Sequence, residues 1–79
     1  MIFMDIKDFI QHFAEQFDDT ELREFEPKTV FHELNEYSSL IALSIILMVD
    51  EEYGVTIDAN DMSSAVTIED LFNTVKSKI

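Results

Sequence analysis

Serine and histidine are the residue types in this 79-residue sequence that could supply a nucleophile and its base. A catalytic serine needs a neighbouring base and an oxyanion hole. His12 lies off the apolar face of its predicted helix and His32 lies in a predicted loop. Neither histidine is linked to a glycine-backed serine turn, and the chain has a single glycine. We therefore expect both histidines to be structural, and we expect the chain not to be an enzyme.

Metal ligands and thiols do not form a recognisable pattern. His12 and Glu15, three residues apart on a predicted helix, supply two ligands, which do not make a site. The stretch that begins at Asp58 faintly resembles a calcium loop, but Met62 and Ser63 stand where an oxygen ligand and a glycine are required. The chain has no cysteine, which excludes a disulfide framework, a zinc knuckle and a thiol nucleophile. We expect no metal site.

The net charge limits the classes of partner that the chain can bind, and the composition and length limit its domain organisation. Acidic residues outnumber basic ones 17 to 5, so the formal net charge is −12. Such a chain repels phosphate backbones and anionic lipid heads, which excludes nucleic acid and membrane surfaces as partners. The apolar share of 47% is high enough to bury a core, and the length allows one domain, residues 1–79.

Neither a membrane span nor a leader is expected. The longest apolar run, residues 40–49, is interrupted by Ser44 and is shorter than the ~20 residues that a bilayer span needs. The opening residues carry no basic segment and no small-residue cleavage site, so we expect a soluble cytoplasmic protein.

Helical periodicity recurs along the chain. A first helix, with Asp5 as N-cap, carries an apolar stripe of Ile6, Phe9, Ile10, Phe13 and Phe17. A long polar stretch, residues 18–37, contains Pro27 and is predicted to be pinned by the apolar anchors Leu22, Phe25, Val30, Phe31, Leu34 and Tyr37.

Three further helices follow the long loop. The second begins at the N-cap Ser38, runs to about Tyr53 and stops at Gly54. A brief helical turn over residues 59–63 follows the cap Asp58, and the last helix begins after Thr67. We therefore predict an all-α fold, a four-helix bundle with a short third helix and a long first loop.

The second helix is apolar almost all round, from Leu40 to Val49. A domain this small cannot enclose such a helix completely, so part of its apolar surface must stay exposed or meet a partner.

The segment Phe31-His-Glu-Leu-Asn-Glu-Tyr-Ser-Ser-Leu40, continued by Ile-Ala-Leu43, resembles the phosphopantetheine attachment region of acyl carrier proteins. Residues 25–31 look like the loop of that family, and residues 50–57 look like the acidic end of its second helix and the anchor that follows. Residues 67–71 look like the start of its last helix. The resemblance covers nearly the whole chain in order and spacing, and it implies a bundle of acyl-carrier type.

In this family the modified serine lies in an Asp-Ser-Leu triplet, which Ser39 and Leu40 match in its last two positions. Ser38 stands where the aspartate is expected; it keeps the helix-capping function but loses the charge that the resemblance assigns to engaging the transferase and its magnesium. A register with Ser38 as the modified residue would place Ser39 at the leucine position and shift Tyr53 and Ile57 out of place. Ser39 is therefore the favoured attachment site.

The resemblance implies a carrier of acyl (or aminoacyl) groups, held as thioesters on a 4′-phosphopantetheine arm attached to Ser39, in fatty acid or polyketide biosynthesis. The implied partners are a phosphopantetheinyl transferase, which uses coenzyme A, and acyl-loading and acyl-processing enzymes that bind a monomeric carrier. Docking would use the apolar and acidic positions of the second helix that match the family's, namely Leu40, Leu43, Leu47, Asp50, Glu51 and Glu52.

Two departures keep a second interpretation open. Ile41 and Ser44 stand where the family is often acidic, which favours docking by apolar contact, and Ser38 replaces the aspartate. The alternative is an acidic helical adaptor on the same fold that is never modified and binds a partner enzyme through the second helix.

The charge imbalance predicts a salt-dependent stability. With 17 carboxylates against five fixed cations, screening should relieve self-repulsion. We expect the melting temperature at pH 7 to rise between about 10 mM and several hundred mM sodium chloride, by several degrees if the gain is about 1 kcal/mol. A melting temperature that is flat or falls over this range, measured by circular dichroism without divalent cations, would contradict the repulsion argument.

Overall fold

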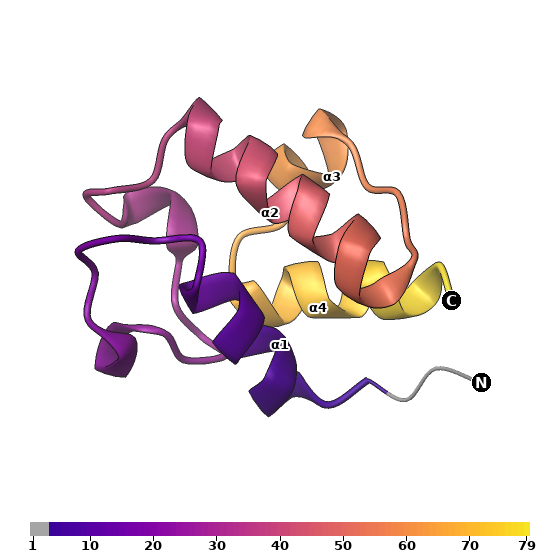
Figure 1. The fold of residues 1–79 in the computed structure, drawn as a ribbon, viewed down its shortest axis with the longest axis horizontal. Coiled ribbons are helices and arrows are strands. Elements are labelled where there is room, and N and C mark those ends of the chain that lie inside the picture. The colour runs from indigo at the N-terminus through magenta and orange to yellow at the C-terminus, as the bar shows by residue number, and fades with distance from the viewer. Residues whose placement is uncertain (1–3) are drawn as a thin grey trace.

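The N-terminal ends of the four α-helices are set by capping side chains. The computed structural model describes residues 4–79; residues 1–3, part of the opening segment examined for a leader, lie outside the described residues. The caps are Asp5, Ser38, Asp58 and Thr67, each of which accepts a first-turn backbone N–H, as predicted. They open α1 (Ile6–Ala14), α2 (Ser39–Tyr53), α3 (Ala59–Ser64) and α4 (Ile68–Ser77) (Figure 1).

Gly54 ends α2. Its φ of 65° lies in the left-handed region that a side chain disfavours, and its N–H donates to the carbonyl of Asp50. The chain then passes Val55 and Ile57, which are buried and hold the link to α3 against the core. The first helix is shorter than its apolar stripe, because it ends at Ala14 while Phe17 is buried beyond it.

The long connection from α1 to α2 contains two short 3-10 turns, η1 (Leu22–Glu24) and η2 (Phe31–Glu33). Phe25 and Phe31 are buried and hold it against α1, as predicted. Leu22 is 58% exposed, so its predicted role as an anchor is wrong. Phe17 and Phe25 already occupy the space beside Phe13, with ring centroids 5.6 and 6.1 Å from it, and Leu22 is left outside.

The connection also meets the start of α4. The N–H of Ile68 donates to the carbonyl of Thr29 at 3.1 Å, and the N–H of Glu69 donates to the carbonyl of Pro27 at 3.0 Å. An isolated antiparallel bridge between Val30 and Thr67 lies beside these bonds. The loop thereby satisfies amides at the N-terminus of α4 that have no partner within the helix.

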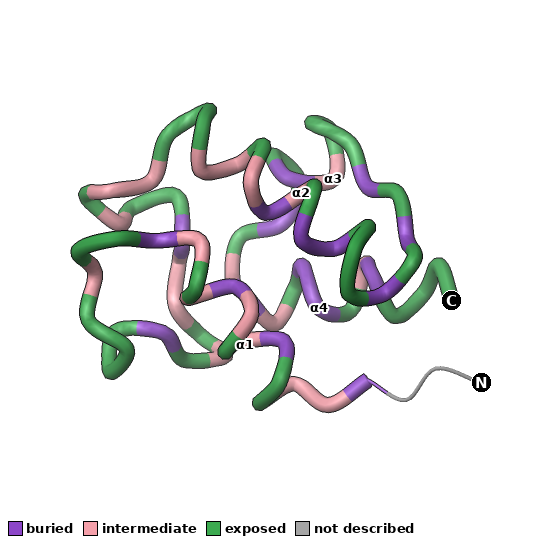
Figure 2. Tube along the Cα trace, viewed as in Figure 1, coloured by how far each residue is buried: buried purple, intermediate pink, exposed green. Residues whose placement is uncertain are grey.

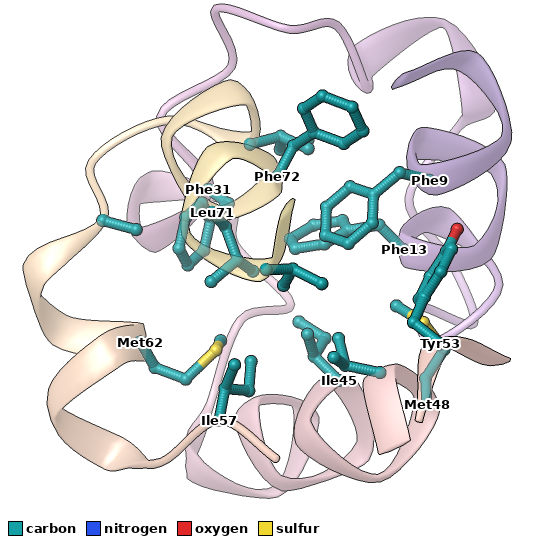
Figure 3. Packing of buried hydrophobic residues seen from close by; sticks show 14 of the residues in the cluster. Phe9, Phe13, Phe31, Ile45, Met48, Tyr53, Ile57, Met62, Leu71 and Phe72 are labelled. Atoms are coloured by element: carbon teal, nitrogen blue, oxygen red, sulfur yellow. The ribbon is translucent and has the colours of Figure 1, made fainter. Parts of the chain in front are cut away.

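Phe13 lies at the centre of an aromatic core (Figure 3). Its ring contacts Phe31 of η2 in an edge-to-face arrangement, with centroids 5.4 Å apart. The fully buried side chains come from α1, α2, α4, η2 and the link after α2: Phe9, Phe13, Phe31, Ile45, Val49, Ile57, Ile68, Leu71 and Val75. The short α3 contributes Met62, which points toward Ile57 (Figure 3).

Fully buried positions along α2 begin at Ile45 (Figure 2). In its first turn Ser39 and Leu40 are exposed, whereas Ile41 and Ala42 are half-buried against the core. The N-terminal turn of α2 therefore exposes one side, with Ser39 and Leu40, and packs the other on the core. Within residues 4–79, no helix combines the length and apolar character required to cross a membrane.

The aromatic core predicts unequal costs for two truncations in the same loop. Phe31→Ala removes a fully buried ring and should lower the free energy of unfolding by about 3–5 kcal/mol, which is comparable with the whole stability of a small domain. Leu22→Ala, at an exposed position, should change it by less than about 0.5 kcal/mol. Urea denaturation followed by circular dichroism measures both, with Phe31→Leu as a milder variant. Similar costs at the two positions would contradict the assignment of the core.

Candidate functional site

Two adjacent serines occupy the start of α2 in different states. Ser38 Oγ accepts the N–H of Ile41 at 3.2 Å and is therefore engaged as the helix cap. Ser39 is exposed in the first turn, and its hydroxyl makes no hydrogen bond with any residue in the described range 4–79. Ser39 presents its Oγ at the positive end of the α2 dipole, where a negatively charged substituent is stabilised.

An apolar groove of about 390 Å³ lies beside Ser39. It runs between α2 and α3, which lie next to each other in Figure 1. The groove was not predicted from the sequence. It is lined by His32, Tyr37, Ser39, Ala42, Leu43, Ile46, Ala59, Met62 and Ser63.

One wall of the groove is held by His32. Its Nε2–H donates to the carbonyl of Met62 at 3.0 Å, which links η2 to α3. Its ring lies 5.1 Å from that of Tyr37, edge to face. Burial raises the pKa of the Tyr37 hydroxyl above its ordinary value, so the side chain is neutral throughout the physiological range. The bond from His32 to Met62 thus fixes one wall of the groove.

Beside Ser39, α2 carries an exposed leucine stripe of Leu40, Leu43 and Leu47, of which Leu43 also lines the groove. These side chains are 72%, 51% and 54% exposed, at helical spacings of three and four residues. The other face of α2 buries Ile45 and Val49. The predicted exposure of apolar surface on this helix is therefore confirmed.

The acidic residues after the stripe divide into two groups. Asp50 and Glu51 are exposed and continue the line of leucines. Glu52 turns toward α1, and its carboxylate lies 3.5 Å from Nε2 of His12. Nδ1 of His12 lies 3.0 Å from the hydroxyl of Tyr53.

Tyr53 closes the end of α2 against α1. Burial raises the pKa of its hydroxyl to about 12, with smaller contributions from the negative charges of Asp8, Glu52 and Asp5. The hydroxyl therefore keeps its proton at neutral pH and stays available as a hydrogen-bond partner of His12. His12 of α1 thus contacts two residues at the end of α2, Glu52 and Tyr53.

The Glu36 carboxylate ties the long loop to the segment before α2. It accepts the backbone N–H groups of Asp18, Asp19 and Thr20 at 2.6, 3.0 and 3.0 Å, and the Thr20 hydroxyl at 2.8 Å. These bonds, the one from Asp18 foremost, hold the pKa of Glu36 below its ordinary value although desolvation acts in the opposite direction. We call this arrangement the Glu36 latch.

No set of three or more histidine and carboxylate groups within residues 4–79 is arranged to hold a metal ion. The predicted residues Ser38, Ser39 and the leucine stripe share the outer part of α2. Sequence reasoning missed the contribution of α3 to the groove and the Glu36 latch. Both depend on contacts between residues far apart in the chain, for which no local pattern exists.

Comparisons of this chain with protein-family models, with curated proteins and with solved structures found no match. Function is therefore inferred from the residues and the geometry of the site itself.

The latch predicts a pH-dependent difference between two charge-removing variants. Because the folded-state pKa of Glu36 is lowered, its carboxylate stabilises the fold above the ordinary pKa of 4.5, and this stabilisation is lost as the pH falls through the lowered value. Glu36→Gln should therefore melt below the wild type at pH 7, and the difference should shrink toward pH 3. Melting temperatures across this pH range measure the effect.

Glu33→Gln is the matched control, because it removes the same charge from an exposed position in η2. We expect it to leave the melting temperature unchanged or slightly higher, since it reduces self-repulsion. Equal behaviour of the two variants would contradict a stabilising latch.

Proposed function

We propose that this chain is an acyl carrier protein in which the Ser39 hydroxyl is the attachment point of a 4′-phosphopantetheine arm. The observation that carries the proposal is the position of Ser39. Ser39 is exposed at the N-terminus of α2, where it lines an apolar groove and lies beside an exposed leucine stripe. The order and spacing of the sequence, which resemble those of acyl carrier proteins, support the same assignment.

The local chemistry suits a phosphodiester at Ser39. The helix dipole and the first-turn N–H groups favour an anion at this end of α2. The Ser38 hydroxyl, by contrast, is already engaged, because it accepts the N–H of Ile41 as the helix cap. When bound, the arm supplies a terminal thiol on which acyl or aminoacyl groups are carried as thioesters, chemistry that a chain without cysteine lacks.

Two surfaces flank the attachment point and suit a carrier. Ala42, Leu43, Ile46 and Met62 in the groove offer apolar contact to a hydrocarbon cargo. The leucine stripe, with Asp50 and Glu51 beyond it, suits partner enzymes that present apolar and basic docking surfaces. We propose that the chain itself performs no catalysis and acts as a cytoplasmic monomer.

The second candidate is an unmodified adaptor on the same fold. The replacement of the expected aspartate by Ser38 favours it, since the carboxylate that would help a transferase engage the carrier is missing. Such an adaptor would use the leucine stripe alone.

Labelling separates the two candidates. Incubated with coenzyme A and a broad-specificity phosphopantetheinyl transferase, the chain should gain the mass of one phosphopantetheine group. Ser39→Ala should abolish the gain, because it removes the acceptor oxygen. Ser38→Ala should retain it at a cost of about 1 kcal/mol in stability from the lost cap. Intact-mass spectrometry gives the result, and tandem fragmentation locates the group.

Ser38→Asp is the informative control. It restores a carboxylate before Ser39 and keeps the cap, so it should be labelled faster than the wild type. If Ser38→Ala is not labelled, and fragmentation of the labelled wild type places the group on Ser38, the assignment of Ser39 as the attachment site is overturned. A wild type and a Ser38→Asp variant that both stay unlabelled would favour the adaptor.

A further inference from the structure

The segment that leads into the attachment helix, residues 35–38, is held at successive positions. Tyr37 packs edge to face on Phe31, with centroids 5.4 Å apart, and so joins the aromatic core. Ser38 caps the helix. Glu36, just before them, reaches to the far end of the loop, where it meets the turn that follows α1.

The Glu36 carboxylate accepts an unusually large number of hydrogen bonds for a single side chain. Three successive amides, those of Asp18, Asp19 and Thr20, converge on its two carboxylate oxygens, and the Thr20 hydroxyl adds a fourth bond. Hydrogen bonds to an ionised acceptor are stronger than those between neutral groups. The partners are 16 to 18 residues away in the chain, so the latch closes most of the long connection into one loop.

The latch lies next to the proposed attachment point. Glu36 is three residues before Ser39, and the turn that it binds lies on the same side of the molecule as the N-terminus of α2 (Figure 1). An enzyme whose active site reaches Ser39 Oγ must also accommodate residues 35–38. The conformation of this segment is therefore part of the surface that such an enzyme meets.

We propose that Glu36 is a positioning residue for the modification of Ser39. It holds residues 35–38 and the turn at 18–20 as one preformed surface beside the first turn of α2. This inference rests on the proposed function of Ser39 as the acceptor.

Loss of the Glu36 latch should affect binding of the carrier by the transferase and leave the chemical step at Ser39 unchanged. When the latch is broken, residues 35–38 sample conformations that the transferase cannot bind. The apparent affinity of the transferase for the carrier then falls in proportion to the fraction of carrier molecules in the binding-competent conformation. The Ser39 hydroxyl and its cap are untouched. The KM for the carrier should therefore rise while kcat is unchanged.

The experiment compares wild type, Glu36→Gln and Glu33→Gln as substrates of a phosphopantetheinyl transferase at pH 7, well below their melting temperatures. For Glu36→Gln we expect KM to rise by about threefold or more with kcat unchanged. Amide hydrogen exchange at residues 18–20 should become about tenfold faster in the same variant. Glu33→Gln should match the wild type in all three quantities.

Faster exchange with an unchanged KM, or a change confined to kcat, would overturn the positioning role and leave Ser39 as the attachment site. Wild-type chain that is not labelled at all would overturn the proposed function and the positioning role together. If Glu36→Gln loses its helical circular dichroism, Thr20→Val takes its place. This variant keeps the carboxylate and its three amide bonds, and we expect a smaller rise in KM with kcat unchanged; an unchanged KM would again overturn the positioning role.

Discussion

The packing of Phe13 against rings from the long loop is the interaction on which the rest of the structure depends. Phe13 lies on α1, whereas Phe25 and Phe31, with centroids 6.1 and 5.4 Å away, belong to the connection between α1 and α2. Because the loop supplies part of the core, it cannot lie free on the surface. Tyr37, packed on Phe31, carries the same constraint to the start of α2, so the direction in which the chain enters that helix is set by the core.

Part of the large excess of negative charge is stabilised by hydrogen bonds from backbone amides. Few cations are available, and ion pairs such as Lys28–Glu69 are exposed and contribute little. Carboxylates instead accept main-chain N–H groups: Asp58 and Asp61 form a reciprocal capping box, Asp70 accepts the amides of Val66 and Thr67, and Glu36 accepts three amides of the loop. The acidic residues thereby define helix ends and a loop contact, a role that lysine and arginine, which carry no acceptor, could not fill.

The apolar character of α2 has two consequences because the domain is small. One face, which includes Ile45, Met48 and Val49, fills the core, while the leucines of the stripe stay more than half exposed within residues 4–79. Between these faces, half-buried Ala42 and Ile46 line the groove toward α3. Exposed apolar surface of this kind is typical of interaction sites, which agrees with a proposed role that depends on contact with other proteins.

The four helices, their caps at Asp5, Ser38, Asp58 and Thr67, and the stop at Gly54 follow from the sequence alone, because capping and periodicity are local properties. The exposure of the leucine stripe follows as well, since an all-round apolar helix exceeds what a small core can cover. Only the tertiary structure decided that Leu22 lies outside while Phe25 is buried, that α3 closes a groove beside Ser39, and that Glu36 binds the turn after α1. Each of these depends on which distant residues compete for the same space or the same amides, and a pattern of near neighbours holds no information about that competition.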